Sequence, residues 1–403
     1  MLPIESTGAT YGAAAAVLSA AGMTSSFLPQ AARASSPATA IIFFIWVIPH
    51  KMCLNLRWVA GRSPTPQKTG RKLRAEGLMS STPAWIVTAM LGVAACSAGD
   101  GPADSGPPGP IDTVPAASPG RGFPALAPWV SFYGTALQMG DLDTVAATFR
   151  IINIDADPDA GHFTTAEIRQ LKAGGRNRVI SYFNLGSCEH YRSYWATVPA
   201  GFVSCEANHA ARRGSYAGYP DEEWMDVGDT SYQRLLLDHV APRLVSRGVD
   251  GFFFDNFEIV EHGPSSGNGP CSASCRQGGL DLIRRLRTKY PDLLFVMQNA
   301  TSDITRLGVT GGLAFTSLLD GISHEEVYAP AFDSQSEAEL IAWSGDSLRP
   351  GGVPFFVGTE DYVGSCGSGA AALAAYTTSR ARGFSPYATD ASGNQTVVCY
   401  WGF

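Results

Sequence analysis

Acidic and amide side chains follow directly after several apolar runs in this 403-residue chain. The clearest case is 249–258, where three consecutive phenylalanines lead to Asp255, Asn256 and, slightly later, Glu258. A continuous apolar run bounded by polar residues is typical of a parallel strand buried on both faces. At the carboxyl end of such a strand Asp255 would be held rigidly for chemistry. An aspartate in a loop or at a helix N-cap would show the same local pattern.

Similar polar residues stand at the ends of other expected strands. They are Asp155, Glu189, Asn299, Glu325, Glu360 and Asp361. A pair of carboxylates, one ionised and one protonated, carries out glycoside hydrolysis, and burial and neighbouring charge drive the two pKa values apart. Several carboxylates would also suit a hard cation such as Mg²⁺ or Ca²⁺. Zinc is disfavoured, because no two histidines lie at helical spacing and no coherent Cys/His set is present.

Eight apolar runs, separated by segments with helical periodicity, would position these side chains. The expected strands are 128–133, 148–155, 178–186, 249–258, 293–299, 320–326, 353–362 and 383–387. The expected helices are 164–172, 232–247, 277–290, 334–347 and 369–382, the first with Thr164 and Glu167 as a capping box. This alternation predicts an α/β fold, a (β/α)8 TIM-like barrel whose strand ends meet at one mouth. An open doubly wound sheet would alternate similarly, but no glycine-rich phosphate motif follows the first strand.

The first 122 residues differ in composition and are not expected to belong to the barrel domain, 123–403. Residues 1–78 are rich in Ala, Ser and Pro, and we expect an unstructured or mis-annotated upstream segment. Residues 79–95 have the layout of a secretory signal peptide that ends just before Cys96. The small residues before Cys96 resemble a bacterial lipobox, which implies that Cys96 is lipidated; a short membrane anchor with an incidental cysteine is the alternative. Residues 96–122 are rich in Gly and Pro, as in a flexible tether.

The overall charge restricts the partners that we expect. The chain carries a net charge of −7, and its second half has no stripe of Lys and Arg. These features argue against nucleic acid as a partner and favour a neutral or cationic ligand. We expect an exported protein, at the cell surface, in the outer membrane or secreted, that acts as a monomer and touches the membrane only through its lipid anchor.

Six cysteines in the second part of the chain are expected to form disulfides, because an exported protein folds under oxidising conditions. The simplest pairs are Cys271 with Cys275, Cys188 with Cys205, and Cys366 with Cys399, although connectivity does not follow from sequence. A catalytic thiol at Cys188, beside Glu189 and His190, is the alternative.

Aromatic side chains near the expected strand ends would offer faces for stacking sugars. They are Tyr133, Tyr182, Trp195, Trp224, Tyr328 and Tyr362. About half of such residues are expected to serve ordinary barrel packing instead.

Three segments of the chain resemble a known family. Residues 180–192 are similar to its third-strand motif, aliphatic-Ala-Tyr-x-x-x-Gly-Glu-x-Glu-x-Tyr-Arg, and 250–255 are similar to its fourth-strand motif, Asp-Gly-aliphatic-Phe-Leu-Asp. Further strand ends fall at Asn299, Glu325 and Asp361. The family is glycoside hydrolase family 114, the endo-α-1,4-polygalactosaminidase-like barrels, and the resemblance extends from residue 129 to about residue 387.

The resemblance implies a barrel that cleaves α-1,4-linked galactosamine polymers without a cofactor or metal. It implies that Asp255 is the nucleophile and Glu325 the acid/base, with Glu326 in that role if the alignment is shifted by one residue. Glu258 lies past the strand end and is expected to be a loop or supporting group. The residues expected to bind substrate are Asp155, Tyr182, Glu189, Asn299, Asp361, Tyr362 and Trp224.

One departure from the family motif concerns the third strand. The first glutamate of that motif is Ser187 here, so that only Glu189 remains. This departure leaves open the alternative of a carbohydrate-binding barrel without activity. The second alternative is a metal-dependent hydrolase that uses the same carboxylates.

Overall fold

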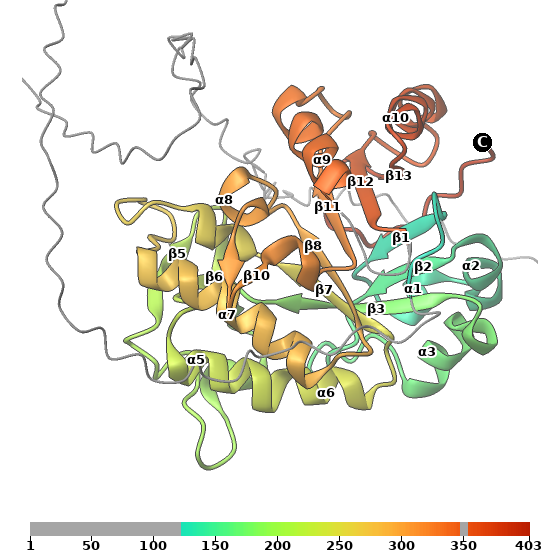
Figure 1. Ribbon diagram of the computed structural model, residues 1–403. Coiled ribbons are helices and arrows are strands. Elements are labelled where there is room, and N and C mark those ends of the chain that lie inside the picture. The colour runs from blue at the N-terminus through green and yellow to red at the C-terminus, as the bar shows by residue number, and fades with distance from the viewer. Residues whose placement is uncertain (1–121, 347–353) are drawn as a thin grey trace, which may run out of the picture. The chain divides into compact units, whose positions relative to one another are not determined.

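The computed structural model describes residues 122–346 and 354–403 (Figure 1). The expectations for the upstream segment, the signal peptide, Cys96 and nearly all of the tether fall outside these residues.

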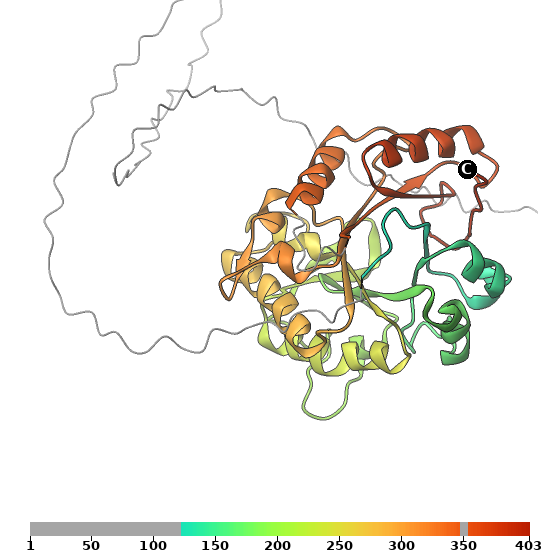
Figure 2. The same cartoon turned by 45° about the vertical axis from the view of Figure 1, so that its right-hand side comes forward.

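Eight parallel strands form one sheet that curls into a nearly closed barrel (Figure 2). In sheet order they are β1 (Trp129–Phe132), β2 (Ile151–Ile154), β3 (Arg178–Asn184), β7 (Gly251–Asp255), β8 (Leu294–Gln298), β11 (Gly321–Glu325), β12 (Phe356–Tyr362) and β13 (Ser385–Thr389). The last strand returns to the first, where Trp129 Nε1 donates a hydrogen bond to the carbonyl of Ser385 at 2.8 Å. The predicted α/β barrel is therefore confirmed, strand by strand.

Helices surround this sheet (Figure 2). The longer ones are α2 (Leu142–Thr148), α3 (Thr165–Leu171), α5 (Thr230–Leu235) continuing through the π-helical turn η2 (Leu236–Val240) into α6 (Ala241–Ser246), α7 (Ala273–Lys289), α9 (Ser334–Asp346) and α10 (Gly369–Ala381). Short helical turns are α1 (Ala136–Met139), η1 (Ala173–Gly175), α4 (Ser193–Ala196), η3 (Phe257–Glu261), α8 (Asp303–Arg306) and η4 (Phe315–Leu318). The predicted capping box is present, with Thr164 and Glu167 each accepting from the other's backbone N–H. Within the two described stretches, no helix has the length and apolar character needed to span a membrane.

A small antiparallel sheet interrupts the β/α alternation after β3. Its order is β4 (Ser187–Glu189), β6 (Tyr219–Met225) and β5 (Arg212–Tyr216). The sequence predicted only a long polar connection here, because the segment has no sustained apolar alternation. A second small pair, β9 (Val309–Thr310) with β10 (Leu313–Ala314), follows β8.

Strand alternation divides the apolar core into an inner and an outer layer. Phe253 packs inside the barrel with Trp129, at 6.2 Å between ring centroids. Its neighbours Phe252 and Phe254 pack on the other side of the sheet against Phe295. The three phenylalanines of β7 thus fill both layers, and the residue two positions after Phe253 faces the interior.

Three disulfides join the cysteine pairs that the sequence predicted. They are Cys188–Cys205, Cys271–Cys275 and Cys366–Cys399, with Cα–Cα distances of 6.5, 5.3 and 5.1 Å. The first holds β4 to the loop that leads into β5, and the last fixes the C-terminal tail to the loop after β12. Cys188 is therefore a half-cystine rather than a free thiol.

Candidate active site

Asp255 ends β7 and lies at the carboxyl-end mouth of the barrel. It shares the inward direction of Phe253, because side chains two residues apart point to the same side of a strand. The register of β7 on β3 places Asn184 beside it, and the Leu185 N–H donates to the Asp255 carbonyl at 3.0 Å. The aspartate is thus fixed by two adjacent strands.

Burial and three other carboxylates raise the pKa of Asp255. Burial raises the pKa of Asp255 well above its ordinary value, and the negative charges of Glu258, Glu325 and Glu222 raise it further. Burial also raises the pKa of Glu258 to about 8 and that of Glu222 to about 7. Such mutual shifts require the groups to be close together. The mouth therefore holds acids of perturbed pKa, as acid/base chemistry requires.

Glu325 ends β11 and accepts hydrogen bonds from three side chains. Asn299 Nδ2 donates to Oε2 at 2.8 Å, Gln395 Nε2 donates to Oε1 at 3.0 Å, and the Tyr362 hydroxyl also donates to Oε1. The backbone N–H of Glu325 donates in turn to Asn299 Oδ1 at 3.1 Å. These bonds set the direction of the carboxyl group.

A fifth acid, Glu360, lies inside the barrel next to Glu325. It stands beside Glu325 in the register of β12 on β11 and is 1% exposed. Burial, and then the charge of Glu325, raise the pKa of Glu360 well above its ordinary value. Tyr133 lies close by: burial raises its pKa well above the ordinary value, and the charges of Asp255 and Glu360 raise it further. Tyr133 meets Tyr182 edge to face at 5.1 Å, so these two rings form part of the inner wall.

Several backbone positions at the mouth are strained. Asn256, Asn299, Glu326 and Gln395 have φ values of 57°, 60°, 55° and 50°, a region that residues other than glycine seldom adopt. Gly186 is needed for a different reason, because a Cβ there would meet the Asn256 carbonyl oxygen at 1.6 Å. Strain of this kind concentrates at functional sites.

Asp155 and Glu189 share one buried arginine. Arg192 donates to Asp155 Oδ2 at 2.9 Å and, through Nε, to Glu189 Oε2 at 3.0 Å. Its guanidinium lies 5.8 Å from the centre of the Tyr182 ring. The two predicted substrate-binding acids are therefore engaged in an ion triad at the edge of the site.

Replacing Arg192 by methionine is expected to lower the free energy of unfolding by about 3–5 kcal/mol, because it leaves two buried carboxylates without a cation. Urea denaturation measures the change. Lys289→Met is the matched control: its partner Asp238 and Lys289 itself are 48% and 38% exposed, so the loss should stay below about 1 kcal/mol. Equal losses in the two variants would contradict this account of the triad.

Two predicted binding residues lie elsewhere than expected. Asp361 points away from the barrel interior, since it alternates with Glu360, and its Oδ1 accepts from the backbone N–H groups of Tyr328 and Ala329 at 2.6 and 2.9 Å. Trp224 is 1% exposed, because Tyr216 stacks on it at 4.1 Å and Asn268 accepts from its Nε1. Asp361 thus organises the loop after β11, and Trp224 packs within the inserted sheet.

Four residues at the mouth were missed or undervalued by the sequence analysis. Glu222 and Tyr219 come from the inserted sheet, and Gln395 comes from the tail after the last strand. Glu258 was expected to be only a supporting group, yet among the carboxylates its charge has the largest effect on the pKa of Asp255. The run Asp221-Glu222-Glu223 was the one available signal for the inserted sheet.

Gln395→Ala is expected to lower kcat about tenfold with little change in KM, because Glu325 loses one of three donors that orient it. Gln395 also forms hydrogen bonds with the Tyr362 hydroxyl at 3.1 Å and with the Ser131 hydroxyl. Its loss therefore removes contacts that hold this side of the mouth in place. Steady-state kinetics measures the change, with exposed Asn394→Ala as the neighbouring control. An increase in KM alone would show that Gln395 binds substrate instead.

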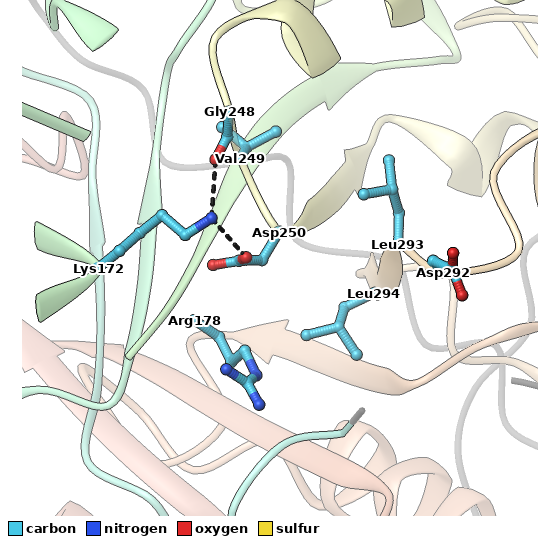
Figure 3. Close-up of a pocket in the computed structure, with 8 residues that line it drawn as sticks. All are labelled: Lys172, Arg178, Gly248, Val249, Asp250, Asp292, Leu293 and Leu294. Atoms are coloured by element: carbon cyan, nitrogen blue, oxygen red, sulfur yellow. Dashed lines mark hydrogen bonds and ion pairs between the residues drawn. The ribbon is translucent and has the colours of Figure 1, made fainter. Parts of the chain in front are cut away.

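A cavity of about 410 Å³ lies at the opposite end of the barrel (Figure 3). It is lined by residues that precede or begin β3, β7 and β8, including Lys172, Arg178, Asp250 and Leu294. Lys172 Nζ bridges the Gly248 carbonyl at 3.0 Å and Asp250 at 2.7 Å, as the dashed lines in Figure 3 show. This end of a barrel commonly serves stability, and the cavity is separate from the acids at the mouth.

Among residues 122–346 and 354–403, no three His, Cys, Asp or Glu side chains are arranged to hold a metal ion.

Comparisons with known proteins identify a matching family model and a relative of similar length. The model of glycoside-hydrolase family GH114 matches residues 121–308, just under half of the chain. An uncharacterized protein of Deinococcus radiodurans is 26% identical over 325 residues, which cover 75% of this chain and 92% of that protein.

Solved structures with a similar fold include two glycoside hydrolases. The glycoside hydrolase domain of PelA from Pseudomonas aeruginosa is 15% identical with a TM-score of 0.49, covering 66% of this chain and 96% of that chain. Cyclic alpha-maltosyl-(1→6)-maltose hydrolase from Arthrobacter globiformis is 15% identical with a TM-score of 0.41, covering 68% and 77%. The segment matched by the family model includes Asp255 and Asn299, and this match supports a glycoside hydrolase.

Proposed function

We propose that this protein is an exported hydrolase of an α-1,4-linked galactosamine-type polysaccharide. The observation that carries the proposal is that Asp255 and Glu325 end two parallel strands of the same barrel, β7 and β11. In keeping with this, burial and then nearby carboxylates, Glu325 among them, raise the pKa of Asp255. Two carboxylic acids in one cleft are what glycosidic bond cleavage needs.

In the proposed reaction Asp255 attacks the anomeric carbon while Glu325 protonates the departing glycosidic oxygen. The bond to the leaving sugar breaks, and a glycosyl ester forms on Asp255. Glu325, now ionised, takes a proton from a water molecule that hydrolyses the ester, and both groups return to their starting forms. Two displacements at one carbon retain the anomeric configuration, which proton NMR of the first product detects.

Asn299, Tyr362 and Gln395 support this scheme by orienting Glu325. Their hydrogen bonds fix both carboxyl oxygens. A group that must transfer a proton to one defined oxygen benefits from such fixation, because a misplaced donor reacts much more slowly.

The activity is expected to rise with pH through a range well above the ordinary pKa of an aspartate. Burial and neighbouring carboxylates raise the pKa of Asp255, so at low pH it is protonated and cannot attack. As the pH increases, Asp255 ionises and kcat/KM rises. A profile of kcat/KM against pH measures this; a plateau that extends down to pH 4 would contradict the proposal.

A cationic sugar polymer suits the mouth of the barrel, because Asp255, Glu258, Glu222 and Glu325 lie near one another there. The ammonium of a galactosamine residue would favour the ionised form of Asp255. Substrate binding would then help to generate the nucleophile.

The test measures the release of reducing ends from partially deacetylated galactosaminogalactan, with and without EDTA. Release that EDTA does not affect is the expected result. Loss of activity in EDTA would favour the metal-dependent alternative, and binding without any release would favour the carbohydrate-binding barrel.

We also propose export as a lipoprotein through Cys96. The three disulfides support it, since such bonds are typical of proteins that fold outside the reducing cytosol. Metabolic labelling with a fatty acid, with Cys96→Ala as control, tests the lipidation.

A further inference from the structure

The inserted sheet places a carboxylate where the family-like motif of the third strand has lost one. β6 pairs antiparallel with β4, so that Trp224 lies opposite Ser187 and Glu222 opposite Glu189. The Ser187 hydroxyl, at the position of the missing glutamate, donates a hydrogen bond to Glu222 Oε1. The negative charge thus reaches the same place from the neighbouring strand.

Two amides fix this carboxylate beside Asp255. Asn184 Nδ2 and Asn256 Nδ2 donate to Glu222 Oε1 at 2.6 and 2.9 Å. Asn184 is the register partner of Asp255 and Asn256 is the next residue in the chain. The same two strand ends therefore hold both Asp255 and Glu222, and the charge of Glu222 raises the pKa of Asp255.

The second oxygen of Glu222 is left without a protein partner. Glu222 is 9% exposed, and its Oε2 makes no hydrogen bond to any residue of the described stretches. The cross-strand neighbour, Glu189, carries the same charge, and Arg192 is already bound by Glu189 and Asp155. Like charges opposite each other cost stability, and Oε2 is not among the buried atoms, so an incoming cation could reach it and would be favoured here.

We propose that Glu222 is a specificity-determining residue that receives the ammonium group of an amino sugar bound next to Asp255. This assignment rests on the proposed function and names the group within the site that selects a free amine over an acetamide. An N-acetylated sugar has no positive charge to offer and leaves Glu222 uncompensated.

An aromatic ring on the same inserted sheet adds a second contact for the sugar. Tyr219 begins β6, is 52% exposed and meets Tyr216 at 4.7 Å between ring centroids. It stands on β6 three residues before Glu222. Partial burial of its hydroxyl, with further contributions from the charges of Glu325 and Asp255, raises its pKa to about 12. An exposed ring near the acids can stack on a pyranose whether or not the amine is acetylated.

The experiment compares the binding of two oligosaccharides, α-1,4-linked tetragalactosamine and its N-acetylated form, by isothermal titration calorimetry. All proteins carry Glu325→Gln to stop turnover. The parent is compared with Glu222→Gln and with the control Glu223→Gln, whose glutamate is next on β6 and pairs with Arg212 instead. Glu222→Gln should weaken binding of the amine form about tenfold or more, while the acetylated form changes by less than about twofold.

Unchanged binding of the acetylated form also shows that the variant folds. Equal weakening for the two oligosaccharides, no weakening at all, or failure of the parent to bind the amine form would overturn the proposal. Tyr219→Ala should weaken the two alike. If the wild type binds with charge selectivity but releases no reducing ends, Glu222 keeps its role and the proposed hydrolysis fails.

Discussion

Asp255→Asn is expected to lower kcat on the polysaccharide by about 10⁴-fold or more, because it removes the proposed nucleophile. The substitution keeps the size and shape of the side chain and removes a group whose pKa burial and three carboxylates raise. Binding should be retained, so that the loss is confined to turnover. Initial rates of reducing-end release and calorimetric binding of an oligosaccharide separate these two effects.

The same strand offers a matched control at its other end. Asp250 precedes β7 and contacts Lys172 and the Val179 N–H, within the cavity of Figure 3 and away from the mouth. Asp250→Asn is therefore expected to keep kcat within about twofold, with at most a small loss of stability. Comparable losses of kcat in the two variants would show that Asp255 acts through the fold rather than through chemistry.

Azide provides a further check on the role of Asp255. Truncating the nucleophile to alanine leaves space for a small anion, which can attack the anomeric carbon from the same side. In Asp255→Ala, azide should restore turnover and yield a glycosyl azide of inverted configuration. Hydrolysis by Asp255→Asn at the wild-type rate without azide would rule out the nucleophile assignment.

The barrel was predictable because each strand is a short apolar run with polar residues at its end. Buried parallel strands need apolar side chains on both faces, and this requirement leaves a strong sequence signal. The polar ends of β7, β8 and β11 were found for the same reason. Their convergence followed from the topology, since all parallel strands of a barrel end at one mouth.

For Asp361, the sequence predicted the position of the strand end but not the direction of the side chain. The strand end was located correctly, but Glu360 and Asp361 are adjacent, and only one of two consecutive strand residues can face the interior. Phe356 packs inside the barrel against Trp129, so alternation assigns the inward direction to Glu360 and Tyr362. Counting from an inner apolar residue would have indicated this.

Glu222 and Gln395 were beyond prediction for a different reason. Each reaches the mouth from irregular or inserted structure, and the contacts that place it are long-range: Glu222 to Asn256, and Gln395 to Glu325. Neither periodicity nor local motif encodes such a contact. The Cys366–Cys399 disulfide holds the tail that carries Gln395. The sequence predicted this pairing, but it did not predict that the pairing would bring Gln395 to the site.

The second large effect is expected for Glu325→Gln. This variant keeps a side chain that fits the same space, but it has no proton to give to the leaving oxygen. We expect kcat on the polysaccharide to fall about 10²- to 10⁴-fold. A synthetic galactosaminide with a good aryl leaving group needs little protonation, so formation of the glycosyl ester from it should be nearly unaffected, and a burst of released phenol should precede slow hydrolysis.

Glu326→Gln is the control for this prediction, because it changes the adjacent carboxylate in the same way. Glu326 has a φ of 55°, and the backbone turns at this residue, so consecutive side chains leave the strand end in different directions. Glu325 alone of the two accepts the bonds from Asn299, Tyr362 and Gln395. Glu326→Gln should therefore stay within about threefold of wild type. If Glu326→Gln instead removed activity and Glu325→Gln kept it, the acid/base would be the neighbouring residue. The hydrogen bonds to Glu325 would then serve to hold the loop after β11.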